Sequence, residues 1–130
     1  SVCMNAMGQR PSELSDSASL LLRYENGATG VINYFANGSK AYAKERVEVY
    51  SQERTLILDN FKSLKGYGFR GFSGQSGGQD KGHTEQFRQL IASLRTGGAP
   101  LIPFADLVNT TAATLAALRS LQEGGWVTVS

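Results

Sequence analysis

Cysteine, histidine and tryptophan each occur once in the 130-residue sequence, and proline occurs three times. The one cysteine, Cys3, cannot form a disulfide within the chain, and no cluster of metal-binding thiolates can be built around it. No apolar run approaches the roughly 18 residues of a membrane-spanning helix, and no signal peptide is visible. We therefore expect a protein of a reducing compartment, the cytoplasm, with no membrane partner. A secreted protein without disulfides stays an alternative.

A large surplus of charge of either sign is also missing, because the net charge is +2 and charged residues make up 18% of the chain. Domains that bind nucleic acid usually carry a much larger basic surplus, so no nucleic-acid partner is expected. Hydrophobic residues make up 41% of the chain, which is typical of a globular protein. A chain of this length can bury about two-thirds of its unfolded surface, and we predict a single domain over residues 1–130.

Recognisable catalytic motifs are absent from the sequence. A lone histidine, His83, with scattered carboxylates is no evidence of a Ser-His-Asp triad, and no His/Cys spacing indicates a metal site. The glycine-rich stretch 66–82 contains neither GxxxxGK[ST] nor a GxGxxG that opens a helix in a βαβ unit. No catalytic residue and no metal ligand is therefore predicted, and we interpret 66–82 as a long loop with aromatic anchors.

Alternation of apolar and polar residues predicts an antiparallel meander between residues 17 and 61. Its four strands are expected at 17–25, 29–36, 45–51 and 54–61. The first two are joined by Asn26-Gly27, which is a strong turn signal for a hairpin. Residues 1–8 are a candidate strand, and 126–129 read as a last short strand.

Two amphipathic helices follow the predicted strands. Apolar residues at helical spacing predict the first over about 83–96, with Asp80 as its candidate cap. The second is expected to begin at Pro103 and to run over roughly 104–122. Strands followed by helices indicate an α+β fold, here an open, mostly antiparallel sheet with two helices packed on one face. The other face is then solvated or covered by something else.

A basic loop separates the second and third predicted strands. Lys40, Lys44 and Arg46 surround Tyr42 in this loop. One interpretation is a solvated hairpin end, and the other is a set of donors for a hydroxylated or anionic ligand. His83 likewise is either a ligand contact at the end of the sheet or an exposed residue in the first turn of a helix.

Three segments carry a resemblance to a known family. Tyr24–Gly38 contains "YENGATGVINYFANG", Lys44–Val49 reads "KERVEV", and Gln79–His83 reads "QDKGH". Together with the helical segment "GGAPLIPFADLVNTTAATLAAL", they resemble the C-terminal domain of NAD(P)-dependent oxidoreductases of the Gfo/Idh/MocA type, which include glucose-fructose oxidoreductase. The resemblance covers about residues 17–125.

This resemblance implies the back half of a two-domain enzyme that acts on a sugar, a cyclitol or a related polyol. NAD or NADP would be bound by an upstream Rossmann domain, and no cofactor would be bound by this domain alone. The dinucleotide fingerprint and the family's Asp-x-x-x-His helix do not occur in the 130 residues. The resemblance therefore implies a substrate-binding and oligomerisation domain that is inactive in isolation, with its catalytic residues elsewhere in the parent enzyme.

The resemblance also implies two groups of site residues. The loop after the second strand and the start of the first helix would approach the substrate through Lys40, Tyr42, Lys44 and His83. The open sheet face would join subunits of a homo-oligomer through Arg23, Asn33, Arg46, Glu48 and Tyr50.

Two other functions stay open from the sequence. The chain could be a stand-alone, non-enzymatic module for dimerisation or for binding a small ligand. It could also be a cofactor-independent enzyme with His83 as its base, in which case a His83→Ala variant would lose activity.

Overall fold

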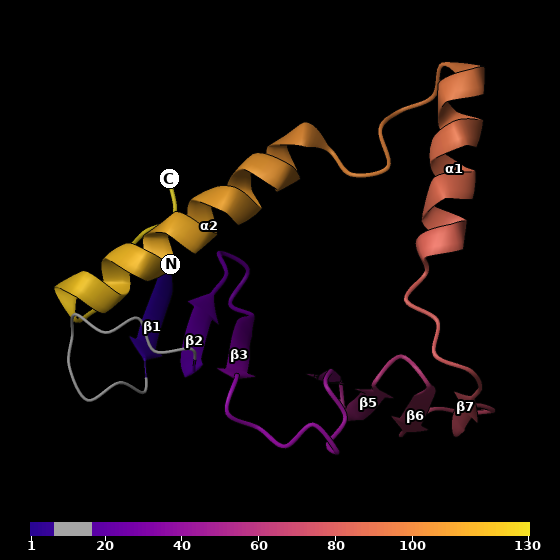
Figure 1. The fold of residues 1–130 in the computed structure, drawn as a ribbon, viewed down its shortest axis with the longest axis horizontal. Helices are drawn as coiled ribbons and strands as arrows, with labels where there is room; N and C mark the ends of the chain where they lie inside the picture. The colour runs from indigo at the N-terminus through magenta and orange to yellow at the C-terminus, as the bar shows by residue number, and fades with distance from the viewer. Residues whose placement is uncertain (7–16) are drawn as a thin grey trace. The chain divides into compact units, whose positions relative to one another are not determined.

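The computed structural model describes residues 1–6 and 17–130 and confirms an α+β fold (Figure 1). The described chain forms two compact units. The first unit comprises Ser1–Gly38 and Ala99–Ser130, and the second comprises Ser39–Gly98. The interpretation of residues 1–130 as one domain stays a prediction.

The first unit contains a three-stranded antiparallel sheet in the order β1-β2-β3. Its strands are β1 (Val2–Ala6), β2 (Ser17–Arg23) and β3 (Thr29–Phe35). The predicted hairpin is present between β2 and β3. At its turn the Asn26 side chain accepts a hydrogen bond from the Ala28 N–H at 3.0 Å, and Gly27 has a φ of 84°. Residues 7 and 8 of the predicted first strand lie outside the described residues.

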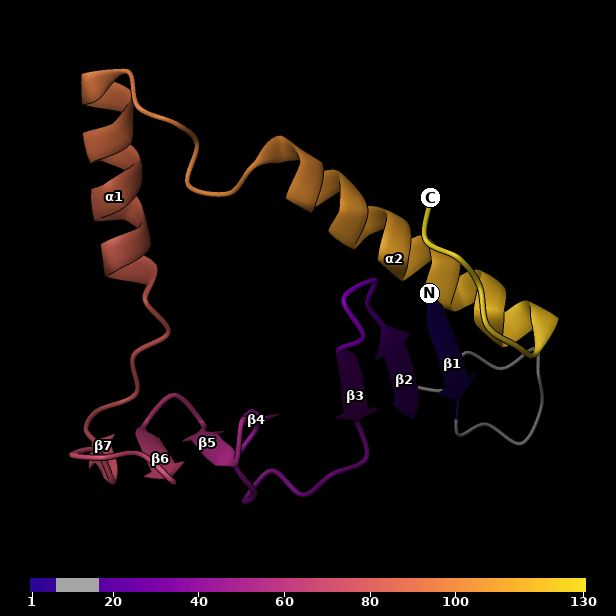
Figure 2. The same cartoon turned by 180° about the vertical axis from the view of Figure 1, so that it is seen from behind.

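Helix α2 (Phe104–Glu123) packs across one face of this sheet (Figures 1 and 2). It buries Ala116 and Ala117 against Val2 of β1. Because alanine has only a methyl side chain, the helix backbone can come close to the strand at these two positions. Leu20 and Leu22 of β2 also pack against this core, so the face of β2 that carries them meets the helix.

The C-terminal segment completes this core without forming the predicted strand at 126–129. Val127 makes one isolated antiparallel bridge with Val2, with both backbone hydrogen bonds at 2.9 Å. Ser120 of α2 is fully buried beside it. The Ser120 hydroxyl accepts a hydrogen bond from the Met4 N–H at 2.9 Å and donates one to the Gly125 carbonyl at 2.5 Å.

The second unit contains a four-stranded antiparallel sheet in the order β4-β5-β6-β7. Its strands are β4 (Arg46–Ser51), β5 (Arg54–Asp59), β6 (Ser63–Tyr67) and β7 (Gly74–Ser76). The last two strands correct the prediction of a loop over 66–82. The chain turns back from β5 into β6 at Asn60-Phe61, where the two residues have φ of 49° and 53°. The periodicity did not indicate a turn of this kind at Asn60-Phe61.

Glycine and phenylalanine explain why β6 continues into the glycine-rich stretch. A Cβ atom added to Gly66 would lie 2.6 Å from the ring of Phe72, so the absent side chain makes room for that ring. The rings of Phe69 and Phe72 meet edge to face with their centroids 6.3 Å apart. These rings are the aromatic anchors that the sequence indicated, and they cover the strand that contains Gly66.

Helix α1 (His83–Thr96) has the predicted bounds, but no residue of it is buried. Asp80 does not cap it. The Asp80 carboxylate instead accepts a hydrogen bond from the Gly82 N–H at 2.8 Å, and the N-terminal position is occupied by Gly82 itself. In the first turns, Arg88 and then Gln89 hydrogen-bond to Glu85 and lower its pKa to about 2.

The strands are thus divided between two sheets, whereas the sequence predicted one continuous meander. The connection between β3 and β4 covers residues 36–45, which is longer than the two- to five-residue loops of hairpins. Helix α2 is the helix that packs on a sheet, since α1 keeps its apolar stripe in solvent. Phe87 of that stripe, for example, is 62% exposed.

Replacing Ser120 with alanine is expected to destabilise the first unit by about 1–3 kcal/mol. The Met4 N–H and the Gly125 carbonyl would lose this partner in a partly buried position. The measurement is urea unfolding followed by the fluorescence of Trp126, the only tryptophan. The control is Thr114→Ala, because Thr114 is on the exposed side of α2 and its hydroxyl bonds only to the helix backbone. Equal unfolding midpoints for the two variants would contradict this role of Ser120.

Candidate binding site

A basic hollow of about 510 Å³ lies in the second unit. We define it by its ten lining residues, which are Lys40, Ala41, Tyr42, Ala43, Lys44, Asp59, Asn60, Lys62, Gln79 and Lys81. They come from three places in the chain: the connection before β4, the turn between β5 and β6, and the segment before α1. The predicted basic loop therefore forms one wall of a concave surface.

Hydrogen bonds between backbone groups hold these three segments together. The Asn60 N–H donates to the Glu45 carbonyl at 2.7 Å, which joins the loop to the β5–β6 turn. The Asp80 N–H donates to the Phe61 carbonyl at 3.0 Å, which joins the turn to the segment before α1. Each of these segments is thus fixed to the next by a bond that does not depend on a flexible side chain.

Side chains reinforce the same junctions. The Gln79 amide donates to the backbone carbonyl of Asn60 at 3.0 Å and to its side-chain oxygen at 3.2 Å. Lys81 forms an ion pair with Glu45, and its ammonium lies 5.7 Å from the centre of the Phe61 ring. This arrangement positions Gln79 and Lys81 at the edge of the hollow.

Positive charge dominates the lining. Lys40, Lys44 and Lys62 form no ion pair within the described residues, whereas Lys81 is paired with Glu45. Asp59 is the one carboxylate among the lining residues, and it stands opposite Arg46 in the β4–β5 pairing. The hollow therefore offers several ammonium donors together with the Tyr42 hydroxyl.

The structure brings together three of the four predicted substrate residues. Lys40, Tyr42 and Lys44 line the hollow, while His83 is the exposed first residue of α1 and does not line it. Sequence reasoning missed Asn60 and Lys62, which occupy a turn that the strand periodicity did not reveal. Gln79 and Lys81 belong to the "QDKGH" segment, so the resemblance marked that segment without assigning these residues a role.

The five residues predicted for the oligomer face are divided between the two sheets. Arg23 and Asn33 lie on the face of the first sheet that does not meet α2, as the alternation along β2 and β3 requires. The Arg23 guanidinium stacks 4.0 Å from the ring centre of Trp126. Asn33 accepts a hydrogen bond from the Ser19 hydroxyl at 2.7 Å.

Arg46, Glu48 and Tyr50 form a hydrogen-bonded row on one face of β4. The Tyr50 hydroxyl donates to one oxygen of the Glu48 carboxylate, and the Arg46 Nε donates to the other at 2.6 Å. The bond from Tyr50 and then the bond from Arg46 lower the pKa of Glu48. The same carboxylate raises the pKa of both Tyr50 and Arg46.

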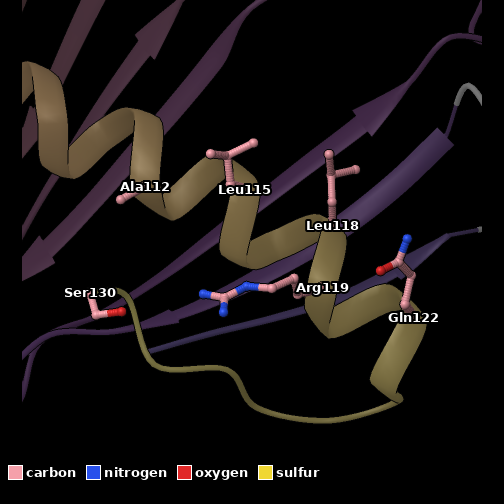
Figure 3. A pocket seen from close by; sticks show the side chains of 6 residues that line it. All are labelled: Ala112, Leu115, Leu118, Arg119, Gln122 and Ser130. Carbon is pink, nitrogen blue, oxygen red and sulfur yellow. The ribbon is translucent and has the colours of Figure 1, made fainter.

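A second hollow of about 440 Å³ lies along α2 in the first unit (Figure 3). Leu115 and Leu118 line it, and the Arg119 side chain extends toward Ser130 (Figure 3). Its lining is mainly aliphatic and holds a single charged group, Arg119. It offers few polar groups to orient a hydrophilic ligand, so the basic hollow is the stronger candidate.

The described part of the chain has neither a metal-binding cluster nor a membrane-spanning helix. In residues 1–6 and 17–130, no three His, Cys, Asp or Glu side chains are grouped as a metal ion would require. Over the same residues, no helix combines the length and the apolar character needed to cross a membrane.

Comparisons with protein-family models, with curated proteins and with solved structures found no match. The arguments for a function therefore come from the residues themselves.

Replacing Tyr50 with phenylalanine is expected to raise the pKa of Glu48 toward the ordinary range of a glutamate. The hydroxyl bond that contributes most to its low pKa would be lost, while Arg46 would still favour the carboxylate. The measurement is an NMR titration of the Glu48 carboxyl carbon with acid. Tyr67→Phe, on the neighbouring part of the same sheet, serves as the control and should leave the titration unchanged. If the pKa of Glu48 is the same in the wild type and in both variants, the hydrogen bond from Tyr50 to Glu48 is disproved.

Proposed function

We propose that this chain is the substrate-binding and subunit-association domain of an NAD(P)-dependent oxidoreductase that acts on a sugar, a cyclitol or a related polyol. The observation that carries the proposal is the gathering of Lys40, Tyr42 and Lys44 in one hollow. These are residues to which the resemblance to the Gfo/Idh/MocA-type domain assigned contact with substrate. In the parent enzyme the cofactor would perform hydride transfer, and this domain would orient the substrate.

The chemistry of the hollow supports binding of a small hydrophilic molecule. Ammonium groups and the Tyr42 hydroxyl can donate hydrogen bonds to substrate oxygens, and Asp59 can accept them. Tyr42 as a whole residue is 70% exposed, so it is accessible to a ligand. The backbone bonds described above keep this wall in place before a ligand arrives.

Exposed apolar side chains support the association role. None of the residues from Ser39 to Gly98, all of which the structure describes, is buried. Val47 and Val49 of β4 and Phe35 of β3 are about half exposed, and Val31 of β3 is 63% exposed. Monomeric proteins seldom leave so many apolar side chains in water along their strands. A partner domain or subunit that covered them would be stabilised by their burial.

Substrate binding can be tested on the 130-residue chain by NMR titration with glucose and with myo-inositol. We expect at least one of the two compounds to shift the amide signals of residues 40–44, Asn60 and Gln79. Lys44→Gln should weaken the interaction, whereas the control Lys65→Gln should not, because Lys65 lies on β6 outside the hollow. Shifts of equal size in both variants, or shifts confined to other residues, would contradict this location of the site.

Membership of a larger oxidoreductase can be tested at the gene. We expect the reading frame upstream of Ser1 to encode a Rossmann domain with a GxGxxG turn and an Asp-x-x-x-His helix. We also expect the complete product to reduce NAD or NADP with a polyol. A stop codon followed by a start codon directly before Ser1 would instead favour the stand-alone binding or dimerisation module.

A further inference from the structure

We propose that the ligand of the basic hollow carries a phosphate or carboxylate group. This inference rests on the proposed binding function and specifies the class of substrate. Its basis is the imbalance of charge and of hydrogen-bonding capacity among the residues that line the hollow.

The lysines converge from separate parts of the chain. Lys40 and Lys44 come from the connection before β4, Lys62 lies in the β5–β6 turn, and Lys81 precedes α1. A solvated hairpin end would explain the first two lysines alone. It does not explain why two distant segments bring further lysines to the same concave surface, where their like charges repel one another.

Internal carboxylates leave most of this charge unbalanced. Glu45 is already paired with Lys81, and Asp59, the one carboxylate of the lining, forms no ion pair with any of the lysines. Three ammonium groups therefore have no carboxylate partner among the described residues. A bound anion would supply the missing charge at the surface that these lysines line.

The hydrogen-bonding capacities lead to the same class of ligand. A neutral sugar hydroxyl both donates and accepts, so a site for it needs acceptors as well as donors. An ammonium group has three donors and no acceptor. Among the acceptors in the lining, the Asn60 side-chain oxygen already accepts a bond from Gln79, and Asp59 is the one carboxylate beside four lysines. Phosphate and carboxylate oxygens are acceptors only, which matches a lining rich in lysine.

The structure also indicates how such a ligand would be held. Lysines bind an anionic group as point charges on flexible stems and impose no fixed geometry on it. The orientation of the remaining polyol would depend on Tyr42, Asp59 and the amides of the hollow. The anionic group would thus provide attraction, and the neutral groups would determine which hydroxyl pattern is accepted.

The test compares neutral and anionic forms of the same compound. The wild-type chain is titrated by calorimetry, in a buffer without phosphate, with glucose, gluconate and glucose 6-phosphate. We expect both anions to bind at least about tenfold more tightly than glucose, since one charge-assisted contact contributes that much. Comparing the affinity for gluconate with that for glucose 6-phosphate then shows whether the hollow prefers a carboxylate or a phosphate. Raising the salt concentration from about 0.05 M to about 0.5 M should weaken the binding of both anions.

Variants assign the effect to the hollow. Lys40→Gln with Lys44→Gln should abolish the preference for the anions, and Lys65→Gln should retain it. Loss of the preference in Lys65→Gln as well would show a diffuse charge effect and would overturn the inference. Equal binding of glucose and the anions would also overturn it, but would leave the proposed substrate-binding function intact. Binding of none of the three, nor of myo-inositol and its monophosphate, would overturn both.

Discussion

The first unit depends on one apolar contact between the two ends of the chain. Val2 of β1 is fully buried against Ala116 and Ala117 of α2, and Val127 closes the same core. The alanines permit this contact, because larger side chains at the two positions would hold the helix away from the strand. Ser120 adds buried hydrogen bonds that fix the helix in register with β1. Without this contact, β1 to β3 would have no covering helix.

The second unit is stabilised differently. It has no buried side chain in the structure, so its order comes from the ladder of β4 to β7, from tight turns and from ring contacts over Gly66. The same turns shape the basic hollow, since Asn60 and Phe61 provide the backbone groups that join its segments. The site and the fold of this unit therefore rest on the same few hydrogen bonds, and the apolar strand surfaces stay available for a partner.

The proposed function unites these two properties. Exposed apolar strands suit a domain that functions within a larger assembly, and a lysine-lined hollow suits a domain that holds a hydrophilic substrate. Lys40, Tyr42 and Lys44 connect the resemblance seen in the sequence with the concave surface seen in the structure. The surplus of ammonium donors is the reason for proposing a substrate with an anionic group.

The local pattern of residues in the sequence determined where most strands and both helices form. Alternation predicted β2 to β5, helical spacing predicted α1 and α2, and composition indicated that Lys40 and Lys44 shared a basic loop. These features depend on neighbouring residues, and so they can be inferred from the sequence. The tertiary structure alone decided that the strands divide into two sheets and that Lys62 and Lys81 join the loop around one hollow. Those outcomes depend on turns of non-glycine residues and on bonds between distant backbone groups, for which periodicity carries no signal.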